Sequence, residues 1–265
     1  MHPVRPSGRR AVPVLLAAAV LLGGCAGLIR ERMYQPDPLA AAGPAWPGRA
    51  PQPVRVATAD GLALEGWYWP PAEPGRDLIV FFHGNAGNRD TAARMAEPLS
   101  RDGRGLLVAS YRGYGANRGR PTREGLIRDA DAFVAEARRL APGSPLVLFG
   151  YSLGGAVALE QATRQRPRMV ITLGAFARIA DLAPWAVRGI MPDRWDNLEA
   201  IRRVEAPVLI VHGTADETVP YAHAGRLHAA APRTSRVLTL EGANHHPDLA
   251  ALTADISRKI DQAPR

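Results

Sequence analysis

The sequence is poor in cysteine. Cys25 is the only cysteine among 265 residues, so no disulfide can form within one chain. The glycine-rich stretch Gly150–Gly155 lacks the lysine and the long glycine spacing of a phosphate-binding loop. His223 and His228 fall on an expected surface helix, and their spacing of five residues does not place them on one face for a metal. Neither a metal nor a cofactor is therefore expected.

The sequence also lacks a cluster of basic residues. Its formal charge is +8, but Arg5, Arg9 and Arg10 lie in a segment that we expect to be removed, which leaves roughly +5 on the remainder. The other arginines are scattered, which argues against a nucleic-acid partner. The hydrophobic fraction of 46% and the charged fraction of 22% are typical of one folded domain rather than of a disordered chain.

No apolar run is long enough for a comfortable membrane span. After Arg9 and Arg10, the apolar run Ala11–Leu22 is short and ends in small residues, which is typical of a signal peptide over residues 1–24. The sequence Leu22-Gly23-Gly24-Cys25 resembles a bacterial lipobox. This resemblance implies cleavage before Cys25, acylation of its sulfur by a palmitate-like chain, and a lipoprotein held in the cell envelope. Ala26, in place of aspartate, favours the outer membrane in a Gram-negative source. An uncleaved anchor with an incidental cysteine is the alternative.

Residues 25–53 are rich in proline. Such a density of proline disfavours regular structure and predicts a tether that lifts a domain over residues 54–265 off the bilayer. The prolines are Pro36, Pro38, Pro44, Pro47, Pro51 and Pro53.

The remaining chain alternates strand and helix signals. A hairpin around Asp60-Gly61 joins two strands, 54–58 and 62–68. Five short apolar runs and a last strand at 236–240 follow, and runs this apolar predict strands buried on both faces of a parallel sheet. Thr122–Leu140, with Thr122 as N-cap, and Ser152–Gln165 are the clearest helices. The predicted fold class is α/β, a mostly parallel doubly wound sheet opened by an antiparallel hairpin. The five apolar runs are 78–82, 106–109, 146–149, 169–173 and 208–211.

Ser152 is the candidate nucleophile. It lies in Gly150-Tyr151-Ser152-Leu153-Gly154, between a strand and a helix, which is the context that a nucleophile elbow requires. A serine hydroxyl needs a base, and the base needs a carboxylate that orients it. Asp216 follows the strand 208–211 and is the candidate acid, with Glu217 as the competitor. The base is His245 or His246, between which the chemistry alone does not choose.

Five motifs together resemble the α/β-hydrolase superfamily, and in particular its BEM46-like and ABHD13/ABHD17-like enzymes. The resemblance implies the order Ser152, Asp216, His245 for a catalytic triad. In that subfamily the last loop usually reads Gly-x-Gly-His-Asn, whereas Asn244 and His246 depart from the pattern here. The motifs are His83–Asn88, Tyr111–Gly115, Gly150–Gly155, His212–Pro220 and Gly242–His245.

The oxyanion hole is expected from the backbone N–H groups of Asn85 and Leu153. His83 and His212 are interpreted as turn-shaping residues. Arg112 either borders the pocket or forms a buried structural ion pair.

A short helical cap is expected at about 175–203, after the strand 169–173. Its apolar side chains, including Phe176, Ile179 and Trp195, either line a site for an acyl group or pack the cap on the core. Cleavage of carboxylic esters or thioesters through an acyl-enzyme is the leading hypothesis, with a peptidase as an alternative. A catalytically silent binding module of the envelope with the same fold is the rival from another class.

Overall fold

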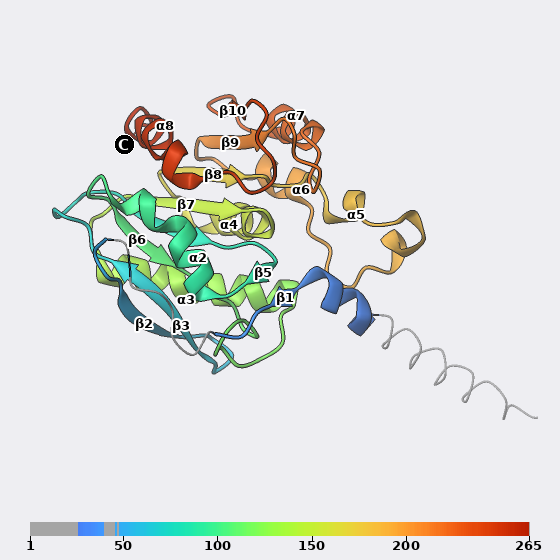
Figure 1. Cartoon of the computed structure of the whole chain (residues 1–265), viewed down its shortest axis with the longest axis horizontal. Helices are drawn as coiled ribbons and strands as arrows, with labels where there is room; N and C mark the ends of the chain where they lie inside the picture. The colour runs from blue at the N-terminus through green and yellow to red at the C-terminus, as the bar shows by residue number, and fades with distance from the viewer. Residues whose placement is uncertain (1–25, 40–45, 47, 265) are drawn as a thin grey trace, which may run out of the picture.

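An eight-stranded sheet forms the centre of the protein. The computed structural model describes residues 26–39, 46 and 48–264 (Figure 1). The strand order is β10-β9-β8-β7-β4-β6-β3-β2. The pairs β2–β3 and β3–β6 are antiparallel, and all other neighbours in this sheet are parallel. The predicted fold class is confirmed. The strands are β2 Gln52–Ala57, β3 Ala63–Trp69, β4 Leu78–Phe82, β6 Gly105–Val108, β7 Leu146–Tyr151, β8 Met169–Leu173, β9 Val208–Gly213 and β10 Arg236–Leu240.

Helices cover both faces of this sheet (Figure 1). One face packs against α3 (Arg123–Leu140), α4 (Leu153–Gln165), α6 (Asn197–Arg202) and α7 (Ala222–Ala230). The other face packs against α2 (Arg89–Ala96), the turn η1 (Glu97–Ser100) and α8 (Leu249–Asp261). Both layers follow from the right-handed crossovers that parallel strands require.

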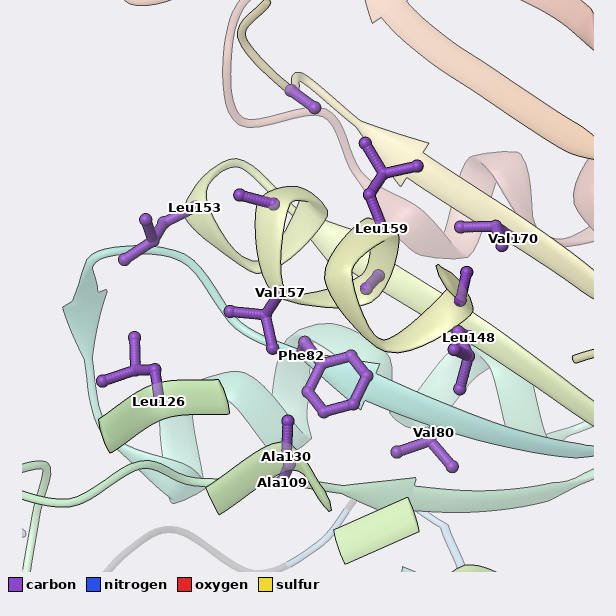
Figure 2. Close-up of a cluster of buried hydrophobic side chains, with 14 of the residues drawn as sticks. Val80, Phe82, Ala109, Leu126, Ala130, Leu148, Leu153, Val157, Leu159 and Val170 are labelled. Carbon is purple, nitrogen blue, oxygen red and sulfur yellow. The ribbon is translucent and has the colours of Figure 1, made fainter. Parts of the chain in front are cut away.

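The central strands are apolar throughout because their side chains alternate between the two layers. In β4, Val80 and Phe82 belong to the core beneath α3 and α4, whereas Ile79 and Phe81 belong to the core beneath α2 and α8. Figure 2 shows Phe82, Val157 of α4 and Ala130 of α3 within one buried cluster. A strand with only one buried face would show polar residues at every second position, which explains why the runs read as continuous.

The helix α3 begins where the sequence predicts. The Thr122 hydroxyl accepts the N–H of Gly125, which satisfies one of the first donors of the helix. Leu126, Ala130 and Phe133 recur at helical spacing and are completely buried. The helix therefore closes one side of the core by burying a single apolar stripe.

Residues 26–36 of the proposed tether have regular structure, so the expectation of none was wrong for this part of it. Residues 26–33 are helical, and Gln35–Pro36 (β1) pairs with Ala86–Gly87 (β5) as a small parallel sheet. No proline lies within 26–33 to interrupt this helix. Tyr34, which follows it, packs in the core and is only 2% exposed. The strand β2 also starts at Gln52, two residues before the predicted start of the domain.

The signal peptide at 1–24 and the acylation site Cys25 lie outside the described residues. Within the described part of the chain, no helix combines the length and the apolarity that crossing a membrane requires.

Candidate active site

Ser152 lies on a strained turn between β7 and α4. Its backbone has φ 52° and ψ −116°, a region that residues with a side chain rarely adopt. The turn directs the serine away from the strand, at the N-terminal end of α4. Strain of this kind persists only where the surrounding structure holds it in place, here the bond from the Ser152 N–H to the Leu173 carbonyl at 2.8 Å.

The glycines around Ser152 are required by close backbone approach. A Cβ on Gly150 would overlap the backbone of Gly154, and a Cβ on Gly154 would overlap the carbonyl of Phe82. The turn, the following helix and the end of β4 thus pack with no space for side chains. The glycine pattern that identified the motif is therefore a steric condition for this turn.

The structure brings Ser152, His245 and Asp216 together. The Ser152 hydroxyl donates to His245 Nε2 at 3.0 Å, and His245 Nδ1 donates to Asp216 Oδ2 at 2.7 Å. All three residues are buried. The base and its orienting carboxylate are therefore arranged as nucleophilic catalysis needs.

Asp216 is held by its own loop. Its Oδ1 atom accepts the N–H groups of Thr218 at 2.9 Å and Val219 at 2.7 Å, which leaves Oδ2 for His245. Glu217, the competitor, is exposed. His212 lies at the end of β9, and its Nε2 atom bonds the Val219 carbonyl at 2.7 Å, in agreement with a turn-shaping role.

The two adjacent histidines have different positions. His245 is buried beside Ser152, whereas His246 is exposed, with its Nδ1 atom 2.6 Å from the Tyr151 hydroxyl. Tyr151 also donates to the His245 carbonyl at 3.1 Å. Sequence reasoning missed this contact of Tyr151, the variable residue before the serine. No local signal could have found it, because its partners lie more than 90 residues away.

Burial lowers the pKa of His245 below the usual histidine value of 6.5, and the hydrogen bond with Asp216 opposes this effect. The lowered pKa keeps the imidazole neutral near pH 7, and only the neutral form can accept the serine proton. The electrostatics and the geometry therefore favour the same role.

Asn85 and Leu153, the expected oxyanion residues, line the same cavity as Ser152. Leu153 is the first residue of α4, where a backbone N–H has no partner within the helix. Two tyrosine hydroxyls hold the loop that carries Asn85. The Tyr111 hydroxyl donates to the His83 carbonyl at 3.1 Å, and the Tyr114 hydroxyl donates to the Asn85 carbonyl at 2.7 Å.

Arg112 forms the buried ion pair and does not line the cavity. Its guanidinium donates to Asp129 and to Asp60 at 2.7 Å each. His83 is buried, and burial lowers its pKa to about 4, which agrees with a structural role. His223 was expected on a surface, which is wrong. It is 6% exposed, and its Nδ1 atom accepts the Ala177 N–H at 2.9 Å, because α7 packs this face against the start of the cap.

A cavity of about 990 Å³ opens beside Ser152. Its size is within the range of small-molecule sites, and its lining is mostly apolar. The cap contributes α5 (Ile179–Leu182) and the turn η2 (Trp185–Ile190). The cap residues that line the cavity are Phe176, Ile179, Leu182, Ala183, Pro184, Val187 and Met191.

The cap residues thus divide between the lining of the cavity and the core. Trp195 packs in the core at 1% exposure, whereas Trp185 is 85% exposed. Among the residues that the structure describes, no group of histidine, aspartate, glutamate or cysteine side chains gathers as metal ligands do.

Family models match two parts of the chain. Residues 73–196 match the model described as serine aminopeptidase S33, and residues 184–256 match that of a TAP-like protein. Together the two matches include Ser152, Asp216 and His245.

Relatives and solved structures match most of the chain. The uncharacterized protein Rv2307c of Mycobacterium tuberculosis is 34% identical over 255 residues, covering 91% of this chain and 90% of the relative. The α/β-hydrolase domain-containing protein 17C of mouse is 30% identical, covering 66% and 56%. The structure of Est1E from Butyrivibrio proteoclasticus with ferulic acid superposes with a TM-score of 0.67 at 23% identity, covering 78% and 98%.

Proposed function

Because the chain belongs to the α/β-hydrolase superfamily, and because its buried serine, histidine and aspartate form one hydrogen-bonded series, we propose that it is a serine hydrolase of carboxylic esters or thioesters. The observation that carries the proposal is the contact of 3.0 Å between Ser152 Oγ and His245 Nε2, next to an open apolar cavity.

The reaction proceeds in two steps through an acyl-enzyme. Ser152 Oγ attacks the substrate carbonyl while His245 Nε2 accepts its proton, and Asp216 stabilises the imidazolium. The N–H groups of Asn85 and Leu153 stabilise the oxyanion. His245 then protonates the leaving alcohol or thiol. Water, activated by His245, attacks the acyl-enzyme and releases the acid.

The cavity supports an ester or thioester with an apolar group. Most of its lining is aliphatic or aromatic, and Glu31 and Arg32 are the two charged side chains among the described residues that line it. Binding in such a site favours an apolar chain over a charged peptide end. The peptidase alternative is therefore placed second, despite the name of the matching family model.

Labelling with a fluorophosphonate probe tests the mechanism. We expect the parent chain to be labelled, Ser152→Ala to remain unlabelled, and His245→Ala to be labelled far more slowly. His246→Ala is the matched control and should be labelled at nearly the parent rate. A folded parent that is neither labelled nor active on any ester or thioester would support the silent binding module instead.

We further propose that Cys25 carries a lipid anchor that holds the protein in the cell envelope. The lipobox-like sequence before Cys25 supports this proposal. Mass spectrometry of the mature N-terminus is the test, with Cys25→Ser as the control. A parent protein that keeps residues 1–24 and has no acyl group on Cys25 would contradict it.

A further inference from the structure

We propose that the N-terminal segment, residues 26–37, takes part in substrate binding and catalysis at the active site. It forms one wall of the substrate cavity and supports the loop that carries the oxyanion donor Asn85. The proposal rests on the hydrolase function proposed above. It assigns to this segment the binding of an apolar substrate chain and the positioning of a catalytic group.

The segment lines the cavity with apolar side chains. Leu28, Ile29 and Met33 line the cavity that also contains Ser152. Figure 1 shows this helix in blue beside the cap that contains α5. Leu28 is 65% exposed, so it does not hold the core together. Because Leu28 lies at the cavity, a bound substrate would provide most of the apolar contacts of its side chain.

The segment is fixed to the end of the cap. The Arg30 guanidinium donates to the Asp193 carboxylate at 2.9 and 3.3 Å, and the side chain of Asp193 is completely buried. Nearby, the Trp195 indole N–H donates to the Tyr34 hydroxyl at 3.3 Å. A charged group without access to water requires its partner, so the Arg30 pair holds the helix and the cap together as one wall.

The segment also bonds to the oxyanion loop. The Gln35 N–H donates to the Asn85 carbonyl at 2.7 Å, and the Asp37 N–H donates to the Gly87 carbonyl at 2.8 Å. Directly after the segment, the Pro38 carbonyl accepts the Asn88 side chain at 2.9 Å. These bonds restrict the backbone of Asn85, whose own N–H must face the oxyanion. Preorganised donors stabilise a transition state without reorganisation, so this support affects the chemical step.

Chain-length selectivity tests the wall. The full-length parent, Leu28→Ala and Met33→Ala are compared on p-nitrophenyl acetate and p-nitrophenyl decanoate. We expect kcat/KM on the decanoate to fall about tenfold relative to the acetate in each variant, because each loses methylene contacts with the chain. The control is Leu252→Ala, which truncates a half-buried residue of α8 outside the cavity. Unchanged decanoate-to-acetate ratios in both variants would overturn the wall.

Backbone substitution tests the support of the oxyanion loop. Gln35→Pro removes the N–H that bonds Asn85, whereas Gln35→Ala keeps it and is the matched control. We expect Gln35→Pro to lower kcat about tenfold on acetate and decanoate alike, with KM unchanged. Thermal unfolding shows whether each variant is folded. Asp37→Pro, which removes the N–H that bonds the Gly87 carbonyl, replaces Gln35→Pro if that variant is unfolded. Folded proline variants with the kcat of Gln35→Ala would overturn the support.

The two levels of the proposal fail in different ways. A parent that hydrolyses no ester and is not labelled at Ser152 contradicts the proposed function. An active parent whose variants keep its chain-length ratio and its kcat contradicts only the role of the N-terminal segment.

Discussion

The two ends of the central sheet both hold buried polar groups, but they use them differently. At the amino ends of the strands, the buried Asp77 carboxylate pairs with both Arg104 and Arg168. Arg168 donates to both oxygens of Asp77 at 2.7 and 2.8 Å, and Arg104 lies 3.4 Å from Asp77 and also pairs with Asp102 and Asp261. These groups join the beginnings of β4, β6 and β8.

At the carboxyl ends the hydrogen-bonded series stays open. It runs from Asp216 through His245 to Ser152, and Ser152 borders the cavity. One end therefore contributes stability through satisfied charges, while the other keeps a polarised hydroxyl available to a ligand. Parallel strands place their following loops at the carboxyl end, which is why the reactive groups gather there.

The largest expected effect is the loss of activity in Ser152→Ala. The variant lacks the nucleophile, so kcat for ester hydrolysis should fall by at least about 10⁴-fold. The unfolding temperature should be nearly unchanged, because the end with the satisfied charges is intact. Steady-state kinetics and thermal unfolding measure both. Activity above a tenth of the parent value would place the nucleophile elsewhere.

The opposite result, lower stability with unchanged activity, is expected for Asp77→Ala. Arg168 would lose its carboxylate partner while remaining buried, so the free energy of unfolding should fall by about 3 kcal/mol. The kcat per folded molecule should stay at the parent value. Urea unfolding measures the first quantity. Glu205→Ala is the control, because its pair with Arg166 is exposed and 4.0 Å long, and it should change stability little. Equal stability in both variants would contradict the comparison.

Ser152→Gly should stabilise the fold while abolishing activity. Glycine adopts the positive φ of this turn without strain, so the free energy of unfolding should rise by about 1 kcal/mol. Ser152→Ala keeps the side-chain carbon and should show no such gain. Urea unfolding of the two variants side by side is the measurement. A glycine variant less stable than the alanine variant would show that the strain is negligible.

The smallest expected effect concerns pH. Protonated His245 cannot accept the serine proton, and burial lowers its pKa, so kcat/KM should stay level down to about pH 6.5 and fall at lower pH. The neighbouring His246 contributes weakly to the lowered pKa, so His246→Ala should move the acid limb slightly toward higher pH. A parent limb centred well above pH 6.5 would contradict the assignment of His245 as the base.

Much of the fold could be predicted because its signals are local. The buried strands β4, β7, β8 and β9 appear as continuous apolar runs, and α3 carries both its cap and its apolar stripe. The location of Ser152 between strand and helix was also readable, since the glycines that permit its turn are neighbours in the sequence.

Some assignments depended on contacts between distant segments. The sequence is compatible with Arg112 at the pocket or in an ion pair, and only the fold brings Asp60 and Asp129 to its guanidinium. His223 looked like a surface residue because α7 alone does not reveal that it packs against Ala177. Prolines after residue 35 suggested a tether, although Tyr34 reaches the core.

The sequence by itself determined the order of the strands along the chain, the turn at Ser152 and the presence of a following acid and histidine. Periodicity and glycine spacing encode these features within a few residues. The resemblance favoured His245, but only the tertiary structure places His245 rather than His246 next to Ser152 and brings residues 26–37 to the cavity. Those outcomes depend on which segments meet across the carboxyl edge of the sheet, and hydrogen bonds between partners about 30 to 160 residues apart leave no local pattern.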